Sequence, residues 1–156
     1  MGLRSVRFGG LLLAALAIFF FTIGSPLRSA SQKKAIYGGS KPLGPYTPGI
    51  DVGNLVFLAG QIGIDPATGK LVGGGIKEQA RQAMENLGRV LKEAGLGYEN
   101  VVKTTIFLAD IGDYPSVNEI YGGFFPQGNP PPARSTVAVA AIPAGARIEI
   151  EVIAAR

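Results

Sequence analysis

Apolar residues follow two different periodicities along the chain. Short runs rich in β-branched and aromatic residues stand at 54–59 and 101–108, and they predict buried strands. Between them, apolar residues recur at intervals of three and four from Ile76 to Ala94, as on the buried face of a helix, and Gly95 is a typical helix end. The middle of the chain is therefore predicted to run strand, helix, strand.

The C-terminal third continues this alternation. A shorter helix is predicted over 114–125, with Asp113 as its N-cap. Three prolines at 130–132 break the chain, and strands are predicted at 135–141 and 147–154. The order of elements predicts the α+β class, a mixed sheet with two helices on one face.

The predicted sheet has a second face that two helices leave uncovered. Its strands hold more apolar side chains than we expect one face to accommodate: Val56, Leu58, Ile106, Leu108, Val137 and Val139. A second copy of the chain is therefore expected to cover the other face.

The N-terminal segment differs from the rest of the chain. Residues 8–27 are uncharged and strongly apolar and follow two arginines, which fits a secretory signal, and their length could also just span a bilayer. The prediction is a signal peptide or membrane anchor at 1–31, in contact with the membrane or the export machinery, and a functional domain at 32–156. The protein is then exported (periplasmic or secreted) or membrane-anchored, with organelle targeting as a minor alternative. Residues 25–50, rich in Ser, Gly, Pro and Lys, are predicted to be a linker.

Composition narrows the possible chemistry. The chain has no Cys and no His, which excludes a thiolate nucleophile, a histidine-based triad and a Cys or His metal site. Proton transfer near neutral pH must then use a carboxylate, Lys, Tyr or water. The net charge of +4 comes from the first 34 residues, because residues 35–156 carry 10 basic and 11 acidic side chains. No nucleic-acid partner is therefore expected.

Four motifs carry candidate chemistry: Gly44-Pro45-Tyr46, Gly60-Gln61-Ile62, PARST at 132–136 and IEIEVIA at 148–154. They stand within longer segments, including GPYTPGI, NLVFLAGQIGIDPATGKLV and VVKTTIFLADIGDYPSVNEIYGGFF, that follow a known family's order and spacing. From about residue 36 to 155 the chain resembles the RidA/YjgF family of enamine/imine deaminases.

The resemblance implies a chorismate-mutase-like fold and a barrel-like homotrimer with active sites in the clefts between subunits. It also implies hydrolysis of reactive imines, as by a 2-iminobutanoate/2-iminopropanoate deaminase, in which a 2-imino acid and water give a 2-keto acid and ammonia. The imines arise from pyridoxal-phosphate dehydratases acting on Ser or Thr. No cofactor and no metal take part, and the small-molecule partner is an imino or keto acid.

Two charged residues are the expected catalytic pair. Arg134 matches the arginine of the family's PAR motif, and its planar fork can hold a carboxylate by two parallel hydrogen bonds. Its alternative role is an ion pair at a strand start. Glu149 matches a glutamate proposed to position or activate the attacking water, which a carboxylate with a raised pKa can do. Alternatively it is a solvated strand residue, as Glu151 is expected to be.

The resemblance also implies substrate-binding positions. Tyr46 matches a tyrosine that closes over the ligand and Asn129 a loop asparagine near it, although both residue types also serve in turns. Backbone amides at Ala59, Gly60 and Thr136 are expected to orient the substrate. The family often has Ser where this chain has Ala59, so a hydroxyl is missing there.

Two other functions compete with the deaminase. The same cleft could bind a small carboxylate or keto acid without turnover, which the missing hydroxyl at Ala59 favours. An endoribonuclease or translation inhibitor, a label that some relatives carry, is less favoured. RNA binding needs a basic surface with interleaved aromatic residues, and residues 35–156 have no charge excess to form one.

Overall fold

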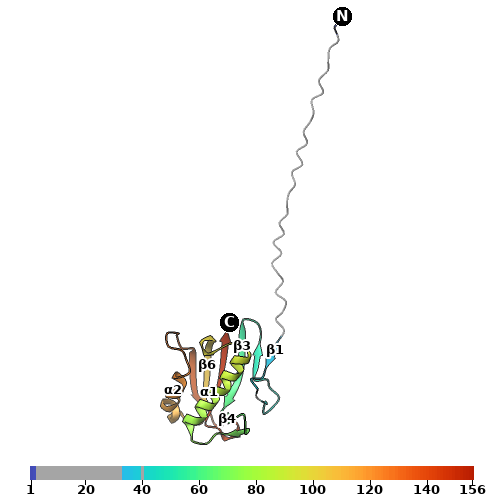
Figure 1. The fold of residues 1–156 in the computed structure, drawn as a ribbon. Coiled ribbons are helices and arrows are strands. Elements are labelled where there is room, and N and C mark those ends of the chain that lie inside the picture. Colours follow the sequence, from blue (N-terminus) through green and yellow to red (C-terminus); the bar gives the residue numbers. More distant parts are fainter. Residues whose placement is uncertain (3–32, 40) are drawn as a thin grey trace.

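The computed structural model describes residues 1–2, 33–39 and 41–156 (Figure 1). Its main sheet consists of β1 (Lys34–Ile36), β2 (Gly49–Asp51), β3 (Leu55–Ile62), β6 (Val101–Leu108), β7 (Ala133–Ala138) and β8 (Ile148–Ala155). The order across this sheet is β1-β2-β3-β8-β6-β7. Only β6 and β7 are parallel, and the other neighbours are antiparallel, so the sheet is mixed as predicted. A short hairpin, β4 (Ile64–Asp65) and β5 (Lys70–Leu71), follows β3.

Two helices, α1 (Ile76–Glu93) and α2 (Tyr114–Gly122), lie on the same face of this sheet (Figure 1). The apolar positions spaced three and four apart on α1 are the ones that it buries, among them Ala83, Leu87 and Val90. They pack on alternate residues of the central strands, such as Ile106 and Ile150, which are fully buried. This core confirms the predicted α+β arrangement.

As expected, the helix-covered face does not hold all six of the apolar residues that led us to expect a second covered face. Val56, Leu58, Ile106 and Leu108 are all buried there. The opposite face, called the open face below, exposes Val137 (44%) together with Leu55 (36%) and Phe57 (43%), which that expectation did not name. The open face is therefore apolar, but through the other half of the alternating pattern.

Three local predictions also change. Residues 25–50 are not simply a linker, because β1 and β2 lie in their described part, and the backbone N–H groups of Tyr37 and Gly38 donate to the Glu93 carboxylate. Helix α2 ends at Gly122 instead of continuing to residue 125. Asp113 stands before that helix, but its side chain makes no capping hydrogen bond.

Three single turns of 3₁₀ helix complete the architecture: η1 (Tyr98–Asn100), η2 (Ile111–Asp113) and η3 (Pro143–Gly145). Turn η2 leads into α2, and η3 leads into β8. Both turns lie at the end of the sheet where β8 begins, because the Ala109 N–H donates to the Arg147 carbonyl. This end of the sheet carries the first candidate site.

Candidate functional site

A pocket of about 340 Å³ lies where β3, the start of β8 and turn η3 meet a loop that precedes β2. It is called the Glu149 pocket below. Its lining combines three of the four motifs singled out in the sequence: Leu43, Gly44, Tyr46, Ala59, Gly60, Ile62, Pro143 and Glu149. Four of the predicted site residues, Tyr46, Ala59, Gly60 and Glu149, thus come together in one chain.

The shape of the Glu149 pocket depends on a β-bulge in β3. The register between β3 and β8 shifts between Leu58 and Gln61, so that Ala59 and Gly60 together oppose one residue of β8. A Cβ on residue 60 would lie 2.7 Å from Glu149 Cδ and closer still to its Oε1. Only glycine therefore lets the carboxylate lie directly against this backbone.

The environment of the Glu149 carboxylate disfavours its charged form. Within the described part of the chain, neither of its oxygens accepts a hydrogen bond. Burial raises its pKa above the ordinary value, and the negative charge of Glu151, two residues along the same strand, raises it further. A carboxyl group with a raised pKa can both take up and return a proton near neutral pH.

The other predicted groups around this pocket are already engaged with their own chain. The Tyr46 hydroxyl accepts a hydrogen bond from the Leu43 N–H at 3.3 Å, which folds the ring back on its loop. The Ala59 N–H donates to the Pro48 carbonyl at 2.9 Å. Of the two backbone amides at this bulge that were expected to orient the substrate, only that of Gly60 remains a candidate. A neighbouring cavity of about 450 Å³ shares Tyr46 and Gly60 and adds Gln61 and Asn86 to its lining.

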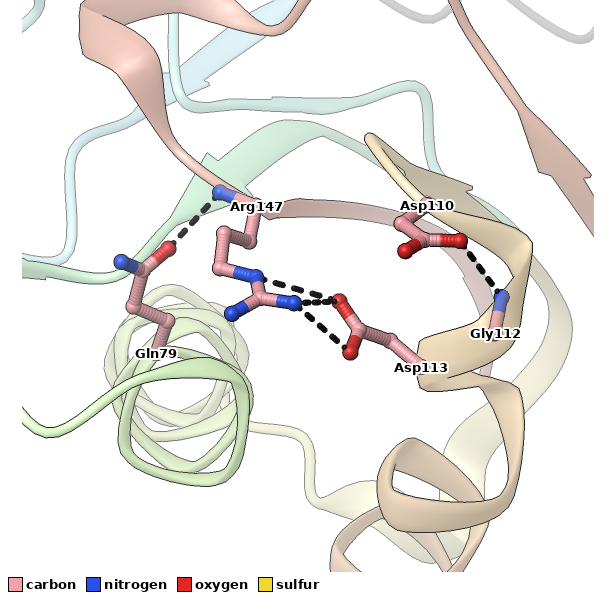
Figure 2. A network of polar contacts seen from close by, with 5 residues as sticks. All are labelled: Gln79, Asp110, Gly112, Asp113 and Arg147. Atoms are coloured by element: carbon pink, nitrogen blue, oxygen red, sulfur yellow. Dashed lines mark hydrogen bonds and ion pairs between the residues drawn. The ribbon is translucent and has the colours of Figure 1, made fainter.

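A polar network holds the strand start that carries Glu149 (Figure 2). The Arg147 N–H donates to the buried Gln79 Oε1 of α1 at 2.8 Å. The Arg147 guanidinium forms a forked ion pair with Asp113, with Nε–Oδ2 at 3.1 Å and Nη2–Oδ2 at 2.8 Å. Asp113 thus ties α2 to β8 and does not cap the helix, and Asp110 instead accepts the Gly112 N–H. This network fixes the backbone two residues before Glu149.

Arg134 lies elsewhere, in a group that we call the Arg134 frame: Arg134 with Tyr114, Asn118 and Tyr121 of α2. Its Nη2 donates to Tyr114 Oη at 3.0 Å and to Asn118 Oδ1 at 2.8 Å. Its Cζ lies 5.5 Å from the centre of the Tyr114 ring and 4.8 Å from that of Tyr121, distances typical of cation–π contact. The side chain is thereby held in one orientation, without an acidic partner among the described residues.

Sequence reasoning missed the three α2 members of this frame. Tyr114, Asn118 and Tyr121 are spaced by four and three residues, so they share one face of the helix. That spacing was a usable signal. Nothing in the sequence indicated contact between α2 and β7. That contact arises because β7 runs parallel to β6 at the sheet edge.

The last two predicted residues lie near the Arg134 frame along the chain. Thr136 follows Arg134 by two residues on the same face of β7, and its Oγ1 is buried without a hydrogen-bond partner among the described residues. The Val139 N–H bonds to β6, so strand alternation turns the Thr136 amide toward the free edge of the sheet. Asn129 is exposed in the loop before β7, where its N–H meets the Pro126 carbonyl at 3.5 Å.

One chain does not bring the two charged residues together. Arg134 is paired with Thr104 of β6, which is buried under the helices. Glu149 is paired with Phe107 on the opposite face, three residues further along β6. Strand spacings place their Cα atoms roughly 14 Å apart, with the side chains on different faces.

The described residues also bear on metal binding and on membrane insertion. No group of three or more Asp or Glu side chains among them could hold a metal ion. No helix in residues 33–39 and 41–156 is long and apolar enough to cross a membrane. The predicted apolar signal at 8–27 lies outside the described residues.

Comparison with known proteins gives close relatives over most of the chain. The family model for endoribonuclease L-PSP matches residues 38–156. The chain is 53% identical to 2-iminobutanoate/2-iminopropanoate deaminase of Rattus norvegicus, over 81% of this chain and 92% of that protein. It is 45% identical to the chloroplastic Reactive Intermediate Deaminase A of Arabidopsis thaliana, over 90% of this chain and 79% of that protein.

A solved structure, E. coli TdcF with bound serine, matches with a TM-score of 0.76 and 38% sequence identity, covering 80% of this chain and 99% of that one.

These relatives correct the predicted localisation. Export or membrane anchoring through residues 8–27 is wrong on this comparison, because the deaminases that match the chain carry no export or membrane designation in their names. The organelle alternative has a counterpart among these relatives, because the Arabidopsis protein is named chloroplastic.

The match therefore extends from the single motifs to the whole described domain. The family model, the identities above 40% and the shared fold all cover the segment that holds both the Glu149 pocket and the Arg134 frame. This chain belongs to the endoribonuclease L-PSP family, which is the RidA/YjgF family that its motifs resemble.

Proposed function

We propose that this protein is a hydrolytic deaminase of reactive enamine/imine intermediates, converting a 2-imino acid and water to a 2-keto acid and ammonia. The observation that carries the proposal is the Glu149 carboxylate: it lies in a pocket against Gly60, its pKa is raised, and it has no hydrogen-bond donor among the described residues. Such a group can activate water without His or Cys, which this chain lacks. The names of the rat and Arabidopsis relatives support the same reaction class.

The complete site combines two copies of the chain. Arg134 and Glu149 lie on opposite faces of one sheet, so one copy supplies the Arg134 frame and its neighbour supplies the Glu149 pocket. The exposed apolar residues Leu55, Phe57 and Val137 of the open face favour association through that face. A closed homotrimer accounts for both, because each of its equivalent interfaces would hold one complete site.

In this arrangement each group has a defined role. Arg134 binds the substrate carboxylate, and the outward-facing Thr136 amide with the Gly60 backbone orients the imine. Glu149 accepts a proton from water as the water oxygen bonds to the imine carbon, the C=N electron pair moves to nitrogen, and Glu149 then returns its proton to that nitrogen. The resulting amino alcohol then breaks its C–N bond as its hydroxyl becomes a carbonyl. The hydroxyl proton leaves with the nitrogen, giving ammonia.

The test measures ammonia and keto-acid release from imines that a threonine or serine dehydratase generates in situ. The full chain should accelerate release over buffer, and Arg134→Ala should lose at least about tenfold of that acceleration, because a charge-assisted carboxylate contact is lost. Arg81→Ala, which removes an exposed arginine of α1, is the matched control and should keep the activity. A full chain that adds nothing over buffer would exclude the deaminase.

One observation favours a second candidate, a binding module without turnover. The TdcF structure holds serine, a small molecule with a carboxylate. In the same test, keto-acid binding without any acceleration would support this candidate. Cleavage of RNA by the full chain would instead support the endoribonuclease named by the family model.

A further inference from the structure

The hydrogen bonds of Arg134 leave its fork incomplete. Nη2 carries two hydrogens, and both are taken, one by Tyr114 Oη and one by Asn118 Oδ1. Each of the two edges by which a guanidinium holds a carboxylate bidentately includes an Nη2 hydrogen. Among the described residues, Nε and Nη1 have no acceptor. With both Nη2 hydrogens occupied, each edge of the guanidinium offers a carboxylate only one hydrogen bond while the frame stays intact.

Tyr114 is placed to supply the missing donor. Its oxygen accepts the Nη2 hydrogen, which leaves its own hydroxyl hydrogen for another acceptor. The side chain is 38% exposed, and its ring lies beside the guanidinium, so a ligand that reaches Arg134 also meets the hydroxyl. Tyr121, the other aromatic residue of the frame, is buried, and its hydroxyl donates to Thr104 Oγ1 instead.

The neighbours of the Tyr114 hydroxyl strengthen it as a donor. The side chain of Asn118 lowers the pKa of Tyr114 through a hydrogen bond, and the charge of Arg134 lowers it further. Both neighbours therefore act on the phenol oxygen as donors or as positive charge, which makes its remaining hydrogen more acidic. A more acidic hydroxyl forms a stronger hydrogen bond to a carboxylate.

We propose that the Tyr114 hydroxyl is a substrate-binding group, which completes with Arg134 a two-donor site for the substrate carboxylate. One carboxylate oxygen accepts from Nε or Nη1 of Arg134 and the other from the Tyr114 hydroxyl, while Asn118 keeps the guanidinium in place. The inference rests on the proposed function for the identity of the ligand, a 2-imino or 2-keto acid. It adds a tyrosine of α2 to the residues that the sequence motifs single out.

The test is the affinity of the full chain for 2-oxobutanoate, the keto acid expected from 2-iminobutanoate, measured by titration calorimetry. Tyr114→Phe keeps the ring beside Arg134 and removes only the hydroxyl, so the dissociation constant should rise about tenfold, as for loss of one hydrogen bond to a charged group. The thermal midpoint should stay close to that of the unmodified chain, because the hydroxyl lies at the surface.

Tyr98→Phe is the matched control for a structural hydroxyl. The Tyr98 hydroxyl donates to the Met84 carbonyl inside the molecule, so its loss should lower the thermal midpoint and leave the affinity unchanged. A Tyr114→Phe chain that binds 2-oxobutanoate equally well or more tightly would overturn the inference, because the hydroxyl would then be idle or in competition with the ligand.

The same measurements separate this inference from the proposed function. If the unmodified chain hydrolyses imines and Tyr114→Phe binds normally, the deaminase stands and the role of Tyr114 is wrong. If the chain binds 2-oxobutanoate through Tyr114 but does not accelerate hydrolysis, the role of Tyr114 stands and the deaminase is wrong. If the unmodified chain does not bind the keto acid at all, the carboxylate site is wrong, and Tyr114 has no role in it.

Discussion

The Glu149 pocket and the Arg134 frame position their charges in opposite ways. Arg134 is held by side chains: two hydrogen bonds and two aromatic rings, all from α2. Glu149 is held by backbone, against a glycine at a β-bulge, on a strand start that Gln79 and Asp113 anchor from a distance. One charge has four close contacts from three residues, and the other has no hydrogen-bond donor in the described part of its own chain.

This difference fits the roles proposed for the two groups. A cation that binds a carboxylate gains from being fixed in one orientation, because its geometry then does not change during the reaction. A base must exchange a proton, and hydrogen bonds to its charged form would lower its pKa and weaken it as a base. The two regions therefore fit a binding half and a proton-transfer half, which lie apart within one copy of the chain.

The largest effect is expected from substitution of Glu149, the residue proposed to transfer the proton. Glu149→Gln preserves the shape of the side chain against Gly60 and removes the base, so the acceleration of imine hydrolysis should fall at least about 100-fold. Ammonia release with dehydratase-generated imine measures it, and binding of 2-oxobutanoate should change little.

Glu151→Gln is the control for this substitution, since it removes the same charge from the same strand at an exposed position outside the pocket. Measured at mildly alkaline pH, it should keep most of the activity. Equal losses in the two variants would mean that general charge on β8, and not a base at position 149, matters.

The next largest effect tests whether the two regions must come from different copies. Chains with Arg134→Ala and chains with Glu149→Gln are mixed, unfolded together and refolded, so that mixed oligomers form. If each site takes its arginine from one copy and its carboxylate from the next, random mixing leaves about one quarter of the sites intact. Activity should then recover to roughly that fraction of the unmodified protein, far above either variant alone. A mixture no more active than its parts would place both residues in a site within one chain.

The sequence predicts α1 and β6 well, because each of these elements is encoded by the apolar pattern of its own residues. The apolar spacing from Ile76 onward and the β-branched run at 101–108 each encode one element, and the structure confirms both. The short strands β1 and β2 escape the prediction because three residues give no periodicity, and only pairing with β3 makes them strands. The same limit explains Asp113, whose partner Arg147 is 34 residues away in the sequence.

The residues of the candidate site also differ in whether local sequence could place them. Residues that lie together in one motif or on one pair of strands, such as Gly60 and Glu149, do meet in the structure. The α2 residues around Arg134 could not be assigned, because contact between this helix and an edge strand depends on the whole sheet order. Ala59 shows a further limit, since its amide is engaged by Pro48, a contact that no motif reveals.

The smallest expected effect concerns how Glu149 acquires its raised pKa. Burial is the main cause and the charge of Glu151 the lesser one, so Glu151→Gln should lower the pKa of Glu149 part of the way toward its usual value. Glu149 acts as a base only when ionised, and activity is lost as the pH falls through its pKa. The acidic limb of the kcat/KM profile should therefore move to lower pH in Glu151→Gln. Glu85→Gln, an exposed acid of α1 that does not affect Glu149, should leave the limb in place. An acidic limb that does not move, or that moves to higher pH, in Glu151→Gln would show that the charge of Glu151 does not raise the pKa of Glu149.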